Sequence, residues 1–249
     1  MSRTALVTGA GAGLGAYVCR RLAEDGWQVV GSVRRPADDP APGVEYVHAD
    51  LGDERQVRAL AEHFEFVPDI VVHNAVAYPE WQGTPDFAAM ETVYRVNTIA
   101  PFLLTRWLLE LPRRDRNDDV AVVVINSESI YHADESSGLY ASGKAALRVL
   151  TTALAASTRG TGVAVSTLLL GPLATAKRDV ELTALATRLG VTLADLTRKA
   201  LERSNPDLVI DEFIDLEACY RSLLHLHATG RTANGALLRL DGGSAGSLI

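Results

Sequence analysis

A tyrosine and a lysine four residues apart are the residues best suited to carry chemistry. Tyr140 and Lys144 stand in the stretch Tyr-Ala-Ser-Gly-Lys, and four-residue spacing places two side chains on the same face of a helix. A phenol has an ordinary pKa of about 10, and a neighbouring ammonium group favours its ionised form. With its pKa lowered toward about 7, Tyr140 is predicted to give a proton to a carbonyl oxygen, or to take one from an alcohol.

Two further polar residues complete the predicted catalytic group. Ser127 follows the apolar, mostly β-branched run 120–126, which predicts a strand buried on both faces. Its hydroxyl can hold the same substrate oxygen at the carboxyl edge of a sheet. Asn97, within a predicted long helix, can place a water that links Lys144 to solvent. Each residue alone has an ordinary structural role in packing, capping or solvation, but together they predict a reaction site.

Glycines near the N-terminus predict the second half of that site. The run Thr8-Gly9-Ala10-Gly11-Ala12-Gly13-Leu14-Gly15 lies between a predicted strand and a predicted helix. Glycines allow a tight turn and a close approach to a pyrophosphate, and a helix N-terminus offers free N–H groups and partial positive charge. This pattern favours dinucleotide binding over an ordinary tight turn.

The residues after the second predicted strand indicate which dinucleotide binds. NAD-binding proteins usually carry an acidic residue there for the ribose 2′-hydroxyl. This chain has Arg34 and Arg35 instead, and Asp38 and Asp39 lie far into the loop. Arginines can hold a 2′-phosphate through charge-assisted, bidentate hydrogen bonds. We therefore predict NADP(H), with NAD(H) less favoured; the alternative is that both arginines are solvated surface charges.

The elements that must position these residues alternate between strand and helix. This order predicts an α/β fold, a doubly wound, Rossmann-like parallel sheet with helices on both faces, in a single domain over 1–249. The polar stretch 173–208 is too long for a simple connection and is predicted to contain one or two short helices and to form a substrate lid; a decorative insertion is the alternative. The predicted strands are 4–8, 27–33, 44–49, 69–74, 120–126, 163–170 and 236–240, and the predicted helices are 14–24, 53–63, 91–111, 140–158 and 211–227.

Over its whole length the chain resembles the short-chain dehydrogenase/reductase family, in its shorter soluble branch. The resemblance rests on Thr8-Gly9-x-x-x-Gly13-x-Gly15, on Ser127 with Tyr140-x-x-x-Lys144, and on Leu240-Asp241-Gly242-Gly243. It implies a catalytic triad of Ser127, Tyr140 and Lys144 with Asn97 as fourth member, and hydride transfer to or from nicotinamide. It also implies a homotetramer or dimer that pairs the helices 91–111 and 140–158, with a C-terminal strand contact in the tetramer.

Cofactor contacts are expected along the same edge of the sheet. Asp50 and Leu51 are predicted beside the adenine, Asn74 and Ala75 on the ribose side, and Thr175 on the carboxamide. The full expected set is Gly9, Gly11, Gly13, Leu14, Gly15, Arg34, Arg35, Asp50, Leu51, Asn74, Ala75, Tyr140, Lys144, Gly171, Pro172, Leu173 and Thr175.

Three positions depart from the family's pattern. Val76 replaces a glycine beside the adenine half, and Leu170 replaces a proline before Gly171. The basic residue that many NADP-preferring members carry inside the glycine turn is absent, because Gly11 and Ala12 stand there. The prediction of NADP(H) therefore depends on Arg34 and Arg35 alone.

The substrate pocket is expected between 78–81, 128–137 and the lid. Its predicted lining residues are Tyr78, Trp81, Glu128, Tyr131 and His132. A mixed aromatic and polar lining suits a ring-bearing or polar carbonyl better than a fatty chain. His132 or Glu128 is a candidate second acid or base, although a surface position is an equal alternative.

Composition excludes several other classes. The net charge of −7 argues against a nucleic-acid or anionic-membrane partner. The two cysteines form no CxxC pair, and we predict no metal site, no signal peptide and no membrane span, hence a cytoplasmic protein. Three functions are compatible with the residues: a ketone reductase or alcohol dehydrogenase, a cofactor-recycling isomerase, epimerase or dehydratase, and a non-catalytic NADP(H)-sensing protein.

Overall fold

A parallel sheet organises the chain and sets the position of the site. The structure is a computed structural model that describes residues 2–78, 86–114, 119–133 and 135–244. The described chain forms one seven-stranded sheet in which every neighbouring pair is parallel. In spatial order its strands are β3 (Val44–His48), β2 (Gln28–Val33), β1 (Thr4–Thr8), β4 (Ile70–His73), β5 (Val120–Ser127), β6 (Val163–Leu170) and β7 (Leu237–Leu240).

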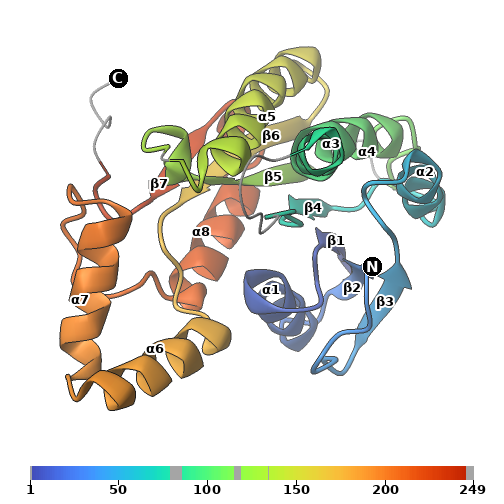
Figure 1. The fold of residues 1–249 in the computed structure, drawn as a ribbon. Helices are drawn as coiled ribbons and strands as arrows, with labels where there is room; N and C mark the ends of the chain where they lie inside the picture. The colour runs from blue at the N-terminus through green and yellow to red at the C-terminus, as the bar shows by residue number, and fades with distance from the viewer. Residues whose placement is uncertain (1, 79–85, 115–118, 134, 245–249) are drawn as a thin grey trace.

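Helices cover both faces of this sheet (Figure 1). α1 (Gly13–Glu24) and α8 (Leu216–Thr229) lie on one face, and α2 (Glu54–Glu62), α4 (Ala100–Leu108) and α5 (Gly138–Ser157) lie on the other. Strand order reverses between β1 and β4, and ligands of such sheets bind at the carboxyl ends of the strands beside this switch point. The predicted doubly wound, Rossmann-like α/β fold is therefore confirmed.

Two apolar layers hold the helices to the sheet. On one side Leu22 of α1 and Leu223 of α8 are almost completely buried, and on the other Leu104 of α4 and Leu147 of α5 are equally buried. Each such side chain contributes roughly 2 kcal/mol through removal of its apolar surface from water. Strands β5 and β6 have apolar residues against both layers, and both are buried as predicted.

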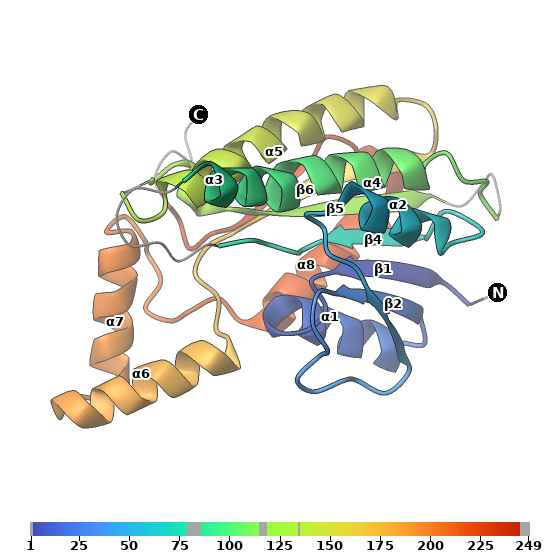
Figure 2. The ribbon, with the colours of Figure 1, turned by 45° about the vertical axis from the view of Figure 1, so that its right-hand side comes forward.

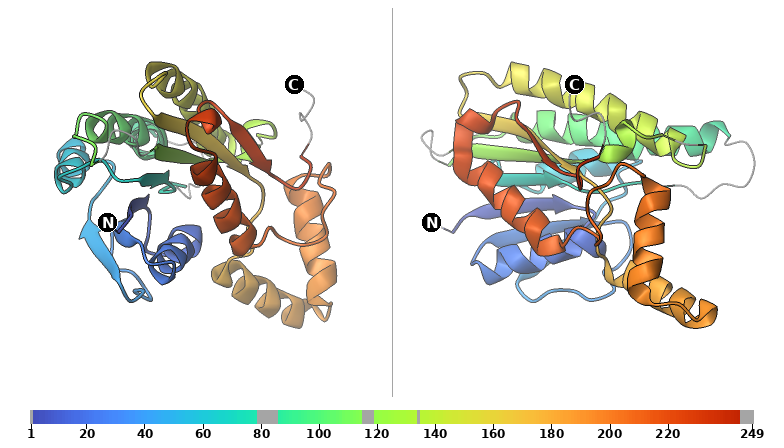
Figure 3. Two further views of the ribbon diagram at one scale, coloured as in Figure 1. Left: turned by 180° about the vertical axis from the view of Figure 1, so that it is seen from behind. Right: turned by 90° about the vertical axis from the view of Figure 1, so that its left-hand side faces the viewer.

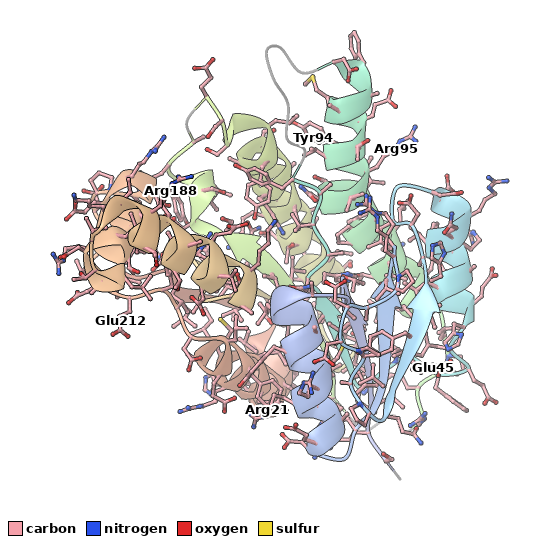
Figure 4. All side chains as sticks on the ribbon, turned by 60° about the horizontal axis from the view of Figure 1, so that its bottom comes forward. Arg21, Glu45, Tyr94, Arg95, Arg188 and Glu212 are labelled. Atoms are coloured by element: carbon pink, nitrogen blue, oxygen red, sulfur yellow. The ribbon has the colours of Figure 1, made fainter. Side chains whose placement is uncertain are left out.

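The sequence predicts a long helix over 91–111 that is interrupted by Pro101, and the structure places the interruption just before this residue. The chain forms α3 (Phe87–Tyr94), a π-helical turn (Arg95–Ile99) and then α4. Pro101 has no N–H to offer the carbonyl four residues earlier, which belongs to Asn97, so the regular hydrogen-bond ladder cannot continue there. Tyr94 and Arg95 point to different sides of this helical column, as Figure 4 shows.

The predicted helix over 211–227 begins later than expected. Asp215 caps α8 by accepting a hydrogen bond from the Glu217 N–H at 3.1 Å, so residues 211–214 precede the helix. These residues lead into α8, and Ile214 pairs with Leu173 in a single parallel bridge.

Between these two paired residues the chain leaves the body of the protein. α6 (Ala176–Leu189) and α7 (Leu193–Ser204) form an arm that stands out at the carboxyl ends of the strands (Figures 2 and 3). Gly190 joins them in the left-handed conformation, with φ of 65°. The expected insertion over 173–208 therefore contains two full helices rather than short ones. Among the described residues, no helix combines the length and apolar character needed to cross a bilayer.

Candidate active site

The glycine turn connects β1 to α1 at the switch point. Gly9 and Gly13 have φ of 69° and 56°, which side chains other than glycine rarely adopt. A Cβ atom on Gly15 would stand 2.2 Å from the Gly9 carbonyl oxygen and 2.5 Å from Asn74 Nδ2. Gly11 is not constrained in this way, because a Cβ there would meet Val33 at an ordinary 3.6 Å.

Asn74 and Ala75, predicted on the ribose side, are locked onto this turn. Asn74 Nδ2 donates to the carbonyl oxygens of Thr8 and Gly9 at 3.0 and 3.2 Å. The Thr8 hydroxyl oxygen accepts from the N–H groups of Asn74 and Ala75, both at 3.0 Å. These bonds join the ends of β1 and β4 and fix the shape of the turn.

The N-terminus of α1 is suited to an anion. Its N-cap, Ala12, makes no side-chain hydrogen bond to the first turn, so no side chain satisfies the first N–H groups of the helix. A Cβ on Gly13 would find no atom within 4 Å, whereas Leu14 turns into the core and is buried. Open space on one side and a packed helix on the other fit a pyrophosphate lying against this turn.

Arg34 and Arg35 follow β2 and are exposed. Nearby Asp39 pairs with Arg20 of α1 at 2.7 Å. Past β3, Asp50 accepts from the Gly52 N–H at 2.8 Å, and Leu51 is buried. A cavity of about 510 Å³ adjoins the segment after β3, and its lining includes Leu51, Asp53, Glu54, Arg95 and Ile99.

Tyr140 and Ser127 come together as predicted. Ser127 ends β5 and Tyr140 lies in the first turn of α5. Burial raises the pKa of the Tyr140 phenol, a hydrogen bond with the Ser127 side chain lowers it in part, and the Tyr78 phenol, whose ring lies 4.9 Å away, raises it further. The expected lowering toward about 7 is therefore not found in the protein alone, because loss of solvent around the phenol outweighs its polar partners.

Lys144 is fully buried one helical turn below Tyr140. Its Nζ donates to the Ile125 carbonyl oxygen at 2.8 Å and lies 6.0 Å from the centre of the Tyr140 ring. Burial lowers the pKa of its ammonium group from 10.5 to about 8. Lys144 therefore keeps its positive charge at neutral pH and loses it as the pH rises above about 8.

The Asn97 side chain holds the segment that follows β4. It accepts from the Ala77 N–H at 2.7 Å and donates to the Ala77 carbonyl oxygen at 2.8 Å. Its role in placing a water that links Lys144 to solvent stays a prediction. Burial lowers the pKa of nearby His73 to about 3, with a further contribution from the Lys144 charge, so His73 is neutral.

The segment after β6, predicted beside the nicotinamide, is fixed by the C-terminal strand. A Cβ on Gly171 would stand 2.8 Å from the Asp241 carbonyl oxygen, so glycine is required there. The Pro172 carbonyl oxygen accepts from the Ile214 N–H at 2.8 Å. Leu173 forms the bridge at the base of the arm, and Thr175 caps α6 by accepting from the Arg178 N–H.

The predicted substrate residues differ in their surroundings. Tyr78 packs against the Tyr140 ring, whereas Tyr131 stacks under the Arg239 guanidinium, 5.4 Å from the ring centre. Glu128 is buried and His132 half-buried, so neither has the surface position weighed for it. Trp81 lies outside the described residues.

Three functional positions escaped the sequence reasoning. Thr8 anchors two backbone N–H groups, and its place directly before the glycines could have indicated this. Asn126 donates to the Lys144 carbonyl oxygen at 3.1 Å, and its polar character at the end of an apolar strand was the available signal. Asn205, which binds Glu128, had no signal in the sequence.

Comparison with known proteins gives one family. The family model described as short chain dehydrogenase matches residues 3–184. The Bacillus subtilis protein named uncharacterized oxidoreductase YvaG is 27% identical, over 99% of this chain and 97% of its own.

Solved structures give the same fold. L-sorbose reductase from Gluconobacter frateurii, in complex with NADPH and L-sorbose, has a TM-score of 0.82 at 18% identity and covers 99% of this chain and 97% of its own. A 4-hydroxyisoleucine dehydrogenase in complex with NADH has a TM-score of 0.76 at 18% identity and covers 97% and 98%. Both nicotinamide cofactors thus occur among proteins of this fold.

Proposed function

Because this chain belongs to the short chain dehydrogenase family, we propose that it is an NADP(H)-dependent oxidoreductase that interconverts a ketone and a secondary alcohol. The observation that carries the proposal is the half-buried Tyr140, whose phenol is hydrogen-bonded with Ser127 and is followed one helical turn later by the Lys144 ammonium. This group lies at the same edge of the sheet as the glycine turn. None of these three residues would support the reaction alone.

Ser127 and Tyr140 act on the substrate oxygen. A bound nicotinamide supplies the hydride to the carbonyl carbon, or accepts it from the alcohol carbon. In the reductive direction the Ser127 hydroxyl holds the carbonyl oxygen and the Tyr140 phenol gives it a proton. Because burial raises the pKa of Tyr140, the phenol keeps its proton at neutral pH and is ready for this step. In the oxidative direction the Tyr140 phenol first releases its proton to solvent, and the phenolate then takes the proton of the alcohol.

Lys144 lowers the cost of moving that proton. Its charge lies about 6 Å from the Tyr140 ring. At an effective dielectric constant of about 20, a unit charge at that distance stabilises a phenolate by roughly 3 kcal/mol. The hydrogen bond to Ile125 fixes the ammonium group in place. The charged lysine therefore stabilises Tyr140 after it has given up its proton.

The preference for NADP(H) is supported by the chain's own residues. Arg34 and Arg35 stand exposed after β2, at the position where an acidic residue would accept from a ribose hydroxyl. Asp39, four residues after Arg35, is already paired with Arg20. A 2′-phosphate would supply the negative charge that this edge lacks.

Replacement of Tyr140 by phenylalanine tests the mechanism. NADPH oxidation is first followed over ketones of graded size, polarity and ring content. With the best ketone, Tyr140→Phe is expected to reduce kcat by about 10²–10⁴ and to leave the Kd for NADPH within about twofold. Tyr46→Phe is the control. It removes a hydroxyl that accepts a hydrogen bond from the Ala41 N–H, far from Tyr140 in the sequence, and it should keep wild-type kcat. Wild-type turnover by Tyr140→Phe would refute the mechanism.

The same screen separates the two other functions. Product formation without net NADPH consumption would favour an isomerase, epimerase or dehydratase, and tight NADPH binding without any turnover would favour a sensing protein.

Four further properties stay predictions: a ring-bearing or polar carbonyl substrate, a lid role for 173–208, a homo-oligomer and a cytoplasmic location. Partly exposed Ile99 and Val149, beside α4 and on α5, support an oligomer through these helices.

A further inference from the structure

A buried carboxylate directly follows Ser127. Glu128 is only 6% exposed. One of its oxygens, Oε2, accepts a hydrogen bond from Asn205 Nδ2 at 3.0 Å. Among the described residues no lysine, arginine or histidine lies within ion-pair distance of this carboxylate. Carboxylates that leave water are normally paired with a cation, because their desolvation is costly.

The surrounding cluster leaves one negative charge without a counter-ion. Asn205 also donates to the Ser244 hydroxyl at 2.9 Å, and Arg239 donates to the Ser244 carbonyl oxygen at 3.0 Å. Arg239 is itself paired with the buried Asp241. This cluster therefore holds two carboxylates and one guanidinium, so the Glu128 carboxylate has no counter-ion among the described residues.

The position of Glu128 joins the reacting groups to the arm. Ser127, which precedes it, hydrogen-bonds with Tyr140. Asn205, which binds it, is the residue that ends α7. Glu128 thus lies between the last residue of β5 and the residue that ends the second helix of the expected lid.

The same short segment contains further unused polar atoms. Ser129 Oγ and His132 Nε2 are both buried without a hydrogen-bond partner among the described residues. Most buried polar atoms of folded proteins are hydrogen-bonded, and exceptions need an explanation. Two such atoms within five residues of an unpaired carboxylate indicate a segment arranged for a polar ligand.

We propose that Glu128 is a specificity-determining residue that binds an ammonium group of the substrate, so that the preferred substrates are amino ketones and the corresponding amino alcohols. The inference rests on the proposed oxidoreductase function. Asn205 holds one carboxylate oxygen, and the other oxygen is left for the substrate's N–H groups. A charge-assisted hydrogen bond of this kind is worth about 1.5–3 kcal/mol, which corresponds to roughly a tenfold to hundredfold preference.

Two alcohols of equal size make the comparison. In 1-amino-2-propanol an ammonium group stands where 2-butanol has a methyl group. The ratio of their kcat/KM values for oxidation with NADP⁺ is measured at pH 8 for the wild type, for Glu128→Gln and for Glu135→Gln. The last variant removes the same charge from an exposed position of the same segment.

The expected ratio is about tenfold to hundredfold in favour of the amine for the wild type and for Glu135→Gln, and about one for Glu128→Gln. Glutamine keeps an oxygen for Asn205, so the brace to α7 is retained, and a melting curve for each variant verifies the fold. A wild-type ratio near one, or an unchanged ratio in Glu128→Gln, would overturn the proposal and leave Glu128 as a brace for α7.

Ligand-observed NMR of the two alcohols, with NADPH present, gives the same comparison without turnover. Glu128-dependent binding of the amine with no Tyr140-dependent turnover of any alcohol or ketone would refute the proposed function and leave Glu128 as an ammonium-binding residue without a role in substrate preference. Tyr140-dependent turnover without any preference for the amine in either measurement would refute this inference alone.

Discussion

Lys144→Met is expected to make the protein more stable while it destroys the proposed site. Burial lowers the pKa of Lys144 from 10.5 to about 8. That difference of roughly 2.5 units corresponds to about 3 kcal/mol of cost for keeping the charged ammonium group inside the folded protein at neutral pH. Methionine has a similar length and carries no charge, so the variant escapes this cost.

The replacement also removes one favourable interaction. The Nζ–H group no longer donates to the Ile125 carbonyl oxygen, and loss of that bond costs about 1–2 kcal/mol. The net gain in the free energy of unfolding at pH 7 is therefore about 1–2 kcal/mol. Few substitutions of a buried residue are expected to stabilise a protein at all.

The pH dependence has a definite sign. Between about pH 8 and pH 10.5 the unfolded lysine binds a proton that the folded lysine has released. Wild-type stability relative to the variant therefore rises with pH through this window. Relative to its value at pH 7, the advantage of Lys144→Met should fall by roughly 2–3 kcal/mol by pH 10.

Urea unfolding of the wild type and Lys144→Met at pH 7 and pH 10 measures both quantities. Lys177→Met is the matched control, because the Lys177 side chain is 83% exposed, and it should change stability by less than about 0.5 kcal/mol. A variant less stable than the wild type at pH 7, or a difference that does not narrow with pH, would show that Lys144 is not held charged at a desolvation cost.

Four other substitutions test the cofactor end. Arg34→Ala should weaken NADPH at least about tenfold more than NADH in fluorescence titrations; equal weakening would mean that Arg34 is a surface charge. Gly15→Ala should abolish NADPH binding and destabilise the fold by more than about 3 kcal/mol, because its Cβ would overlap the Gly9 carbonyl oxygen, whereas Gly11→Ala should cost less than about 1 kcal/mol; similar behaviour of the two would contradict the geometry. Thr8→Val leaves two N–H groups without their acceptor and should cost about 2–4 kcal/mol in urea unfolding; a loss below about 1 kcal/mol would mean that other acceptors replace it.

The sequence alone determined the fold class and the grouping of the reactive residues. Short, β-branched apolar runs such as 120–125 favour strands buried on both faces, and their alternation with helices predicts a parallel sheet. Parallel strands end at one edge, so a serine after β5 and a glycine turn after β1 had to lie together. The four-residue spacing of Tyr140 and Lys144 needed only the geometry of one helix.

Tertiary structure decided what depends on burial and on distant partners. The sequence predicted that Lys144 lowers the pKa of Tyr140, but the depth of burial raises it and lowers that of Lys144 instead. The bonds of the Asn97 amide to Ala77 depend on a segment twenty residues away. The pairing of Glu128 with Asn205, 77 residues apart, has no local signal. Local spacing fixes which side chains share a face, but desolvation and long-range hydrogen bonds exist only once the chain has folded.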